Sequence, residues 1–423
     1  MPIEMVKSIE KCYISMSTAS TKSTYTLTKG QNTDNCVPFC SWERGNAQTG
    51  IDNFYYNMID VYFEDGTKVA VERDTAGVNV VITATVYVVE FEPTEVSVQQ
   101  GTWTISNGST TGNATVSTVD QTRAAALAYW KTDYSSSHPD DVFPLYYFTS
   151  NTNLRFERYN TPAYYVSGHY YIFQALKNQW TVQTFDSGTV TTNQLDVTIS
   201  PVVMDRTFII CSYHAHNSYS QYSAAYFQLV NTTTVRMRTN NSTGKRFRGF
   251  VIESVDDAIF VQRYELYMDA TPTQSDTQTL GTEVNLDKAI AKHGCALPFG
   301  RGTGTSPWYY AYGRTQLSNS TTVRIDRYSG HTYATYHWVE IVEFPTTELY
   351  CEGTVRVDGV LTSGIDVNLF LRENDELVGE DTTTAGGVFE IPSRHQAYHY
   401  LVAKATESGT NSVILDWLYP TVS

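Results

Sequence analysis

The residues best suited to bind a metal ion are two histidines separated by one alanine. His214 and His216 would point to the same face of a β-strand, because side chains alternate along a strand. Cys211 lies just upstream, and imidazole and thiolate groups are ligands for transition metals. No carboxylate or third histidine lies in this stretch, so the ligand set is incomplete. We therefore favour a structural role here, as for His395 and His399, and expect no metal ion and no cofactor.

The six cysteines also lack the spacing of a metal site. Cys36 and Cys40 form the only close pair, and no second Cys or His pair completes a zinc site. Buried free thiols are the favoured interpretation, with a disulfide or a metal site as the alternatives.

Sequence patterns of hydrolytic enzymes are missing from the chain. It has no G-x-S-x-G, H-E-x-x-H or P-loop pattern. Carboxylate pairs for glycoside hydrolysis leave no local pattern, but the acids here alternate along expected strands or lie in expected turns, as Asp140 and Asp256 do. We therefore expect that the protein is not an enzyme.

Aromatic clusters are the remaining candidates for binding. The chain has 31 tyrosines, and Tyr and Trp anchor protein–protein interfaces or provide flat faces on which sugars stack. The clustered candidates are Tyr146, Tyr147, Tyr164, Tyr165, Trp308, Tyr309 and Tyr310. Because such clusters recur along the chain, packing is favoured over glycan stacking.

Composition and charge limit the partners of these residues. The net charge of −15 disfavours nucleic acid, since phosphate binding requires a basic surface. No run of about 18 apolar residues is present, so we expect no membrane insertion. With 41% hydrophobic and only 17% charged residues, the chain is expected to be globular and rich in Thr, Ser and Tyr, which suits β-structure.

The elements that must position these residues recur along the chain. A middle strand appears at 68–73, 153–158, 234–239 and 322–327, and a closing strand at 86–91, 170–175, 249–254 and 338–344. Both markers keep a period of roughly 80 to 90 residues, which is longer than a solenoid repeat and fits one small β-sandwich per repeat. The only segments that suggest helices are 120–128 and 286–292.

Charged residues at the ends of these strands suggest structural pairs. An arginine ends the middle strand and an acid lies in the closing strand, which predicts the cross-strand pairs Arg73–Glu90 and Arg327–Glu343. We expect these pairs to stabilise the sandwich rather than to catalyse a reaction.

The sequence changes character after Pro345. A T-x-x-x-G-x-F element at Thr383–Phe389 precedes an aromatic strand at Tyr398–Ala403, and this order resembles the transthyretin-like or carboxypeptidase-regulatory-like Ig fold. The expected fold class is therefore all-β: tandem β-sandwich repeats followed by an Ig-like domain. The expected domains are 1–95, 96–178, 179–256, 257–346 and 347–423.

The fourth repeat carries a second resemblance. Cys295–Phe299, Thr322–Arg327 and Trp338–Phe344 are similar to repeats in tailed-bacteriophage virion proteins, and Ig-like modules occur in such proteins too. The resemblance implies a structural virion component of the tail, collar or fibre attachment, or a capsid decoration. Its partners would be other virion proteins and copies of itself. The alternative is a carbohydrate-binding protein that recognises a host surface glycan, and a glycan-degrading enzyme is a third interpretation.

Overall fold

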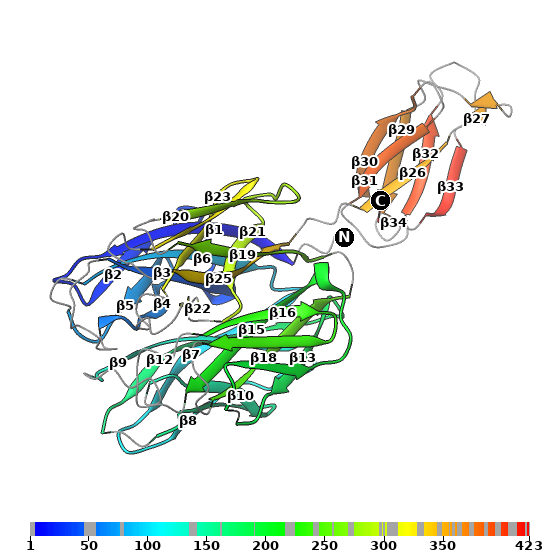
Figure 1. The fold of residues 1–423 in the computed structure, drawn as a ribbon. Coiled ribbons are helices and arrows are strands. Elements are labelled where there is room, and N and C mark those ends of the chain that lie inside the picture. The colour runs from blue at the N-terminus through cyan, green and yellow to red at the C-terminus, as the bar shows by residue number, and fades with distance from the viewer. Residues whose placement is uncertain are drawn as a thin grey trace. The chain divides into compact units, whose positions relative to one another are not determined.

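The structure is a computed structural model. It describes residues 5–45, 56–76, 80–134, 142–160, 163–189, 191–215, 225–239, 245–255, 258–269, 275–295, 298, 301–302, 312–327, 334–344, 349–354, 356–357, 360–361, 366–371, 376–384, 388–393, 399–404, 413–418 and 421–422. The chain divides into two compact units, one spanning Met5–Pro345 and one containing Thr346–Ser423 (Figure 1). Each unit is considered by itself.

The first unit is built from strands that follow one another in the same order in every repeat. The first repeat contains β1 (Val6–Met16), β2 (Lys22–Thr26), β3 (Cys36–Gly45), β4 (Asp60–Asp65), β5 (Lys68–Glu72) and β6 (Val81–Phe91). The second contains β7 (Val96–Ile105), β8 (Thr111–Thr115), β9 (Ala124–Thr132), β10 (Leu145–Ser150), β11 (Asn153–Glu157) and β12 (Val166–Ala175). The third contains β13 (Trp180–Asp186), β14 (Gln194–Thr198), β15 (Thr207–Ala215), β16 (Ala225–Asn231), β17 (Thr234–Thr239) and β18 (Lys245–Ser254). The fourth contains β19 (Phe260–Met268), β20 (Ser275–Thr279), β21 (Ala289–His293), β22 (Arg301–Gly302), β23 (Arg314–Asn319), β24 (Thr322–Asp326) and β25 (Thr335–Glu343).

Each repeat forms two antiparallel sheets, which we call the long sheet and the short sheet. The long sheets have the orders β1-β6-β3, β7-β12-β9, β13-β18-β15 and β19-β25-β21, the last extended by β22 beside β25. The short sheets have the orders β2-β5-β4, β8-β11-β10, β14-β17-β16 and β20-β24-β23. The fold class predicted from the sequence, all-β with repeated sandwich-like domains, is confirmed.

The two strands that carry the sequence repeat are the central strands of the two sheets. The middle strands became β5, β11, β17 and β24, each at the centre of a short sheet, and the closing strands became β6, β12, β18 and β25, each at the centre of a long sheet. A central strand is paired along both edges and covered on both faces, as the burial of β6 from Ala84 to Phe91 shows. The repeat can be recognised in the sequence because these central strands tolerate few residue types.

The helices expected at 120–128 and 286–292 are absent from the described residues there. Ala124–Thr132 is the strand β9 and Ala289–His293 is the strand β21, and each follows a short turn. Alanine favours helix only weakly, whereas β9 is buried on both faces against its sheet, so tertiary packing decides the conformation. The described helical segments are the 3₁₀ turns η1 (Thr33–Asn35) and η4 (Met204–Arg206). No helix in the described part of the chain is long and apolar enough to cross a membrane.

The four repeats close into a cycle of contacts. The short-sheet edge strand of each repeat packs against the long sheet of the next: β4 on β12, β10 on β18 and β16 on β25. The last repeat then returns to the first, where β23 packs on β6 and β3. Figure 1 shows this return as the yellow strands of the fourth repeat beside the blue strands of the first. No repeat in this cycle is terminal, so no repeat-to-repeat surface needs a separate cap.

One position of the closing strand joins the repeats at every junction. It is held by Tyr87, Tyr171, Phe250 and Glu340. The hydroxyl of Tyr87 accepts a hydrogen bond from the amide of Leu317 in the fourth repeat at 2.7 Å. The hydroxyl of Tyr171 donates to the carbonyl of Val61 in the first repeat at 3.1 Å. The same position thus reaches into the preceding repeat, whichever side chain occupies it.

The second unit is a smaller pair of sheets. Its strands are β26 (Leu349–Thr354), β27 (Arg356–Val357), β28 (Val360–Leu361), β29 (Asp366–Leu371), β30 (Glu376–Thr382), β31 (Val388–Ser393), β32 (His399–Lys404), β33 (Val413–Leu418) and β34 (Thr421–Val422). The sheets have the orders β31-β26-β34 and β30-β29-β32-β33, and β27 pairs with β28. Val367, Phe389 and Ile391 are buried between them. The element at Thr383–Phe389 joins the two sheets, because β30 and β31 belong to different ones.

Candidate functional site

The tyrosines at the junction of the second and third repeats make contacts within the protein. Tyr146 is 1% exposed, and its amide donates a hydrogen bond to the hydroxyl of Ser212 at 3.1 Å. Tyr147 donates its hydroxyl to Glu157 at 2.6 Å, and the guanidinium of Arg248 lies over its ring at 3.6 Å. Buried or covered rings offer no face to a sugar, so both side chains pack repeat against repeat.

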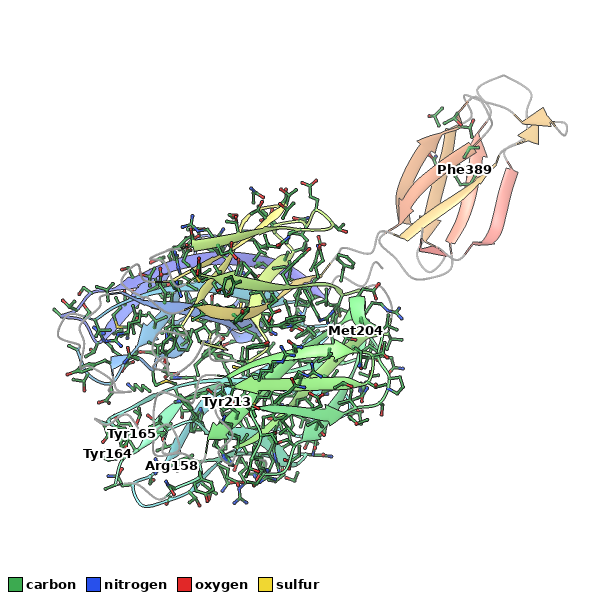
Figure 2. All side chains as sticks on the ribbon, viewed as in Figure 1. Arg158, Tyr164, Tyr165, Met204, Tyr213 and Phe389 are labelled. Carbon is green, nitrogen blue, oxygen red and sulfur yellow. The ribbon has the colours of Figure 1, made fainter. Side chains whose placement is uncertain are left out.

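The second tyrosine cluster also serves a junction. Tyr165 donates its hydroxyl to Asp74 in the first repeat. Tyr164 packs edge-on against Tyr134, with ring centroids 4.5 Å apart, and its carbonyl accepts a hydrogen bond from Arg158 at 2.9 Å. Figure 2 shows Tyr164, Tyr165 and Arg158 gathered at one end of the second repeat. The third candidate cluster, Trp308, Tyr309 and Tyr310, lies outside the described residues.

The cross-strand pairs predicted for Arg73–Glu90 and Arg327–Glu343 are wrong. The arginine ends a short-sheet strand and the acid belongs to a long-sheet strand, so the two are not neighbours in any sheet. The side chain of Arg73 is instead buried and donates to the carbonyl oxygens of Ser17 at 2.7 Å, Ser20 at 2.8 Å and Val80 at 2.9 Å. Burial lowers the pKa of Arg73 to about 10.

Arginine at this position holds the loops of its repeat together. In the second repeat Arg158 donates to the carbonyls of Ser106 and Ser109 as well as Tyr164. In the fourth, Arg327 donates to the carbonyl of Asp269. In the third repeat Thr239 occupies the position, and Lys245 from the closing strand donates its ammonium to Thr239. A buried basic side chain is thus found here where the arginine is lost, and burial lowers the pKa of Lys245 to about 7.

The acids of the closing strands anchor turns. In each repeat a backbone amide lies near the turn that leads into the third strand. This amide donates a hydrogen bond to a side-chain oxygen of the closing strand. The pairs are Asn32–Glu90 at 3.1 Å, Asp120–Gln174 at 2.8 Å, Val203–Glu253 at 2.7 Å and Asn285–Glu343 at 2.7 Å. An amide oxygen accepts as well as a carboxylate, which explains why glutamine appears at this position in the second repeat.

The metal candidates are not assembled into a site in the described part of the chain. His214 is buried in β15, while His216 and His395 lie outside the described residues, as do Asp140 and Asp256. No group of three or more His, Cys, Asp or Glu side chains among the described residues is placed to hold a metal ion. Cys12, Cys36, Cys211 and Cys295 are buried, as predicted.

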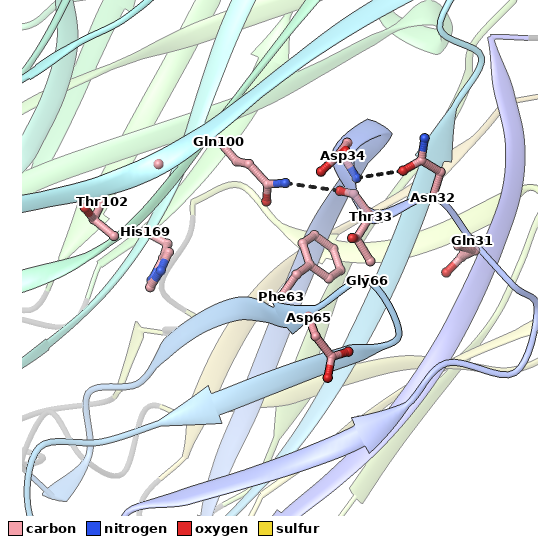
Figure 3. A pocket seen from close by; sticks show the side chains of 11 residues that line it. Gln31, Asn32, Thr33, Asp34, Phe63, Asp65, Gly66, Gln100, Thr102 and His169 are labelled. Atoms are coloured by element: carbon pink, nitrogen blue, oxygen red, sulfur yellow. Dashed lines mark hydrogen bonds between the residues drawn. The ribbon is translucent and has the colours of Figure 1, made fainter.

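A hollow at the junction of the first and second repeats brings together residues that the sequence did not single out. It has a volume of about 660 Å³, within the range of small-molecule sites. The turn η1, the tip of the β4–β5 hairpin and the strands β7 and β12 of the second long sheet surround it (Figure 3). Its lining consists of Gln31, Asn32, Thr33, Asp34, Phe63, Asp65, Gly66, Gln100, Gly101, Thr102 and His169.

The imidazole of His169 is held in one orientation at the edge of this hollow. Asp60, which is 2% exposed, accepts the backbone amide of His169 at 3.0 Å with one oxygen. Its other oxygen lies 2.6 Å from Nδ1 of the same residue. The ring of Tyr62 stacks on the imidazole with centroids 4.5 Å apart. Because the carboxylate accepts, the proton belongs on Nδ1, and Nε2 presents a lone pair.

Two opposing effects act on the pKa of Asp60 in the Asp60–His169 pair. Burial raises the pKa of Asp60, and the hydrogen bonds from His169 act in the opposite direction. In the described part of the chain no side chain or backbone group is hydrogen-bonded to Nε2 of His169. An oriented imidazole with an open Nε2 can accept a hydrogen bond from a hydroxyl group of a ligand.

Local spacing could not reveal this site, because Asp60 and His169 belong to different repeats. The repeats give no signal either. His169 occupies the position of Thr85, Arg248 and Trp338 in the other closing strands, and four different residues at one position mark none of them.

Comparisons with known proteins give little. No protein-family model matches the sequence, and no curated protein matches it. Among solved structures, the backbone protein of the group B streptococcus pilus 2b is 9% identical, with a TM-score of 0.19 over 56% of this chain and 83% of that chain.

Two further solved structures are also bacterial pilins. The major pilin subunit BcpA of Bacillus cereus is 8% identical, with a TM-score of 0.15 over 76% of this chain and 95% of its own. The T6 backbone pilin of serotype M6 Streptococcus pyogenes is 7% identical, with a TM-score of 0.19 over 92% and 81%. Scores this low do not establish a shared fold, so these likenesses carry no argument about what this chain does.

Proposed function

We propose that the protein is a structural, non-enzymatic component of a tailed-phage virion that acts through protein–protein contacts. The observation that carries the structural role is the closed cycle of repeats. A body in which every repeat is packed between two others resists local opening, because separating any repeat breaks two interfaces. Such a body suits a part that must keep its shape in an assembly.

Support for the virion comes from the sequence of the fourth repeat and from the Ig-like module that follows it. The first choice of location is the tail, collar or a fibre attachment, and capsid decoration is the second. Tyr146, Tyr147 and Tyr165 pack within the chain, so assembly contacts fall to the outer strands of the first unit and to the module Thr346–Ser423.

The internal tyrosines and the C-terminal module have different roles in this proposal. Internal tyrosines fix the geometry of the first unit, while a module that forms a compact unit of its own is suited to contact a neighbouring subunit. Other virion proteins and further copies of this chain are the proposed partners.

The test is quantitative mass spectrometry of purified phage particles from cells that carry the gene. The proposal expects the full chain in infectious particles at a constant copy number relative to the major capsid protein, and antibody labelling at one site on the particle. Recovery of the chain only in the soluble fraction of the lysate, with none in particles, would contradict it.

A further inference from the structure

The four junctions of the cycle are built alike, and one of them is left open. At each junction a cross-strand pair on the long sheet faces the preceding repeat. The pairs are Tyr13–Thr85, Thr102–His169, Asp186–Arg248 and Glu265–Trp338. Because these residues occupy equivalent positions, three junctions serve as internal references for the fourth.

At the other junctions a residue of the pair contacts the preceding repeat. Arg248 lies over Tyr147 and pairs with Asp186 at 2.5 Å. Tyr13 lies beneath the guanidinium of Arg314 of the fourth repeat, 5.4 Å from its ring centroid. Glu265 accepts a hydrogen bond from the hydroxyl of Tyr226 at 3.1 Å. Side chains with a long reach therefore cover three junctions.

The junction of the first and second repeats lacks this cover. Thr102 is short and exposed, and Asp60 holds the imidazole of His169 against Tyr62 instead of letting it reach outward. The space that remains is the hollow of about 660 Å³. Its lining combines polar side chains with the aromatic ring of Phe63.

The lining offers several hydrogen-bond acceptors. Asp34 contributes a carboxylate and His169 contributes the lone pair of Nε2. The carboxylate of Asp65 also lines the hollow, but it already accepts hydrogen bonds from Thr67 and lies 3.4 Å from the ammonium of Lys68. Gln31 is 4% exposed, and its side-chain oxygen has no hydrogen-bond partner among the described residues. A buried acceptor without a donor costs free energy, so a ligand that donates hydrogen bonds would satisfy the site. The two carboxylates disfavour an anionic ligand.

One wall of the hollow is aromatic. Phe63 is half-buried, packs edge-on against Tyr171 at 5.9 Å between centroids, and contributes to the lining. Figure 3 shows its ring between Asp34, His169 and the hairpin tip at Asp65. A saccharide matches this combination, because its ring has an apolar face of C–H groups and a rim of hydroxyl donors.

We propose that this hollow binds an uncharged saccharide. The ring lies against Phe63, a hydroxyl donates to Nε2 of His169, and a further hydroxyl donates to the carboxylate of Asp34. A divalent cation fits less well. Calcium takes six to eight oxygen ligands, and the described residues contain no group of three acidic or histidine side chains placed for a metal. The inference goes beyond the proposed structural role and does not depend on it.

The test compares two variants on the same strand. Thr102→Tyr places in the hollow the residue that the first repeat carries at the equivalent position as Tyr13, so the fold tolerates it. Thr104→Tyr is the matched control, because Thr104 is also exposed on the same face of β7 but does not line the hollow. Asp34→Asn removes one acceptor charge without changing the size of the side chain.

The probes are maltotriose, cellotriose, chitotriose and a β-linked galactotriose, measured with the full chain by saturation-transfer NMR and calorimetry. The inference expects at least one trisaccharide to bind. It expects Thr102→Tyr to weaken that binding at least tenfold, Asp34→Asn to weaken it severalfold, and Thr104→Tyr to leave it unchanged.

Three outcomes would overturn the inference: no trisaccharide binds, Thr102→Tyr binds as well as the unmodified chain, or calcium chloride alone binds at the hollow and loses affinity in Asp34→Asn. The presence of the chain in phage particles is a separate measurement, so failure here leaves the structural proposal standing.

Discussion

Glu340 offers the sharpest test of how the repeats are joined. Its carboxylate is fully buried in β25, at the junction of the third and fourth repeats. One oxygen lies 2.9 Å from the ammonium of Lys292, and the other lies 3.3 Å from Nε of Arg263. The carboxylate also accepts the amide of Ile209 in the third repeat at 3.2 Å. Glu340→Ala removes all three interactions together.

The expected loss in the free energy of unfolding depends on the two buried cations that lose the Glu340 carboxylate. Lys292 and Arg263 are 7% and 9% exposed in their side chains, so water cannot solvate them after the substitution. Removing one partner of a buried ion pair costs about 3–5 kcal/mol, because the remaining charge is uncompensated. The Arg263–Glu340 contact lacks hydrogen-bond geometry, so most of the loss comes from Lys292 and from the amide of Ile209. We expect a decrease of about 3 kcal/mol or more in the free energy of unfolding.

The assay is urea unfolding followed by tryptophan fluorescence. Asp287→Ala is the control, since Asp287 also joins two repeats, through Lys29 at 2.7 Å, but its side chain is 76% exposed. An exposed pair contributes less than about 1 kcal/mol. A loss below about 1 kcal/mol for Glu340→Ala would refute the claim that this buried cluster of the fourth repeat, which hydrogen-bonds to backbone groups of Ile209 and Met204 in the third repeat, stabilises the junction.

Three further predictions concern single groups. Glu343→Gln should leave the free energy of unfolding within about 0.5 kcal/mol of its original value, because an amide oxygen can still accept the hydrogen bond from the amide of Asn285, as Gln174 accepts one in the second repeat. Glu343→Met should lower the free energy of unfolding by about 1 kcal/mol in the same urea assay. Equal losses for both variants would contradict the turn-anchor role. Burial lowers the pKa of His293 to about 4 from an ordinary value of 6.5, so below pH 6.5 the unfolded chain takes up a proton that the folded one does not. The contribution of His293 to the free energy of unfolding should be constant above pH 6.5 and fall by up to about 3 kcal/mol as the pH falls to 4. A urea midpoint that is flat over this range would exclude a buried neutral imidazole. Burial raises the pKa of the Cys211 thiol well above its ordinary value, so iodoacetamide should modify it in urea and not in native buffer; rapid modification of the native protein, found by mass spectrometry, would contradict the packing of the third and fourth repeats.

The central strands could be predicted from sequence because the closing strands are buried on both faces, as in β6, and the middle strands alternate buried and half-buried residues, as in β11 and β17. A central strand tolerates few residue types, so the patterns around Val69 and Val323 and around Val86 and Val339 repeat with a constant period. The partition of these strands between two sheets could not be predicted, because sequence does not show which strands pair. The supposed pairing of Arg73 with Glu90 failed for this reason.

The junctions were hidden for a related reason. Each joins the short sheet of one repeat to the long sheet of the next, so the contacting residues are far apart in sequence. Tyr146 and Tyr147 were recognised as packing residues, but nothing local shows that their partners lie in the same chain. Asp60 and His169 could be paired only with the structure in hand. Alanine-rich 124–128 looked helical because propensity was considered without burial.

The closed cycle is the central claim, and zero-length cross-linking tests it directly. A carbodiimide joins an ammonium and a carboxylate that are in contact, and Lys29 in the first repeat touches Asp287 in the fourth. Lys22 and Glu64, 2.5 Å apart within the first repeat, are the internal reference. In monomeric full-length protein, peptide mass spectrometry should find the Lys29–Asp287 amide in a yield similar to that of Lys22–Glu64. Recovery of the Lys22–Glu64 product without the Lys29–Asp287 product would contradict the return of the last repeat to the first.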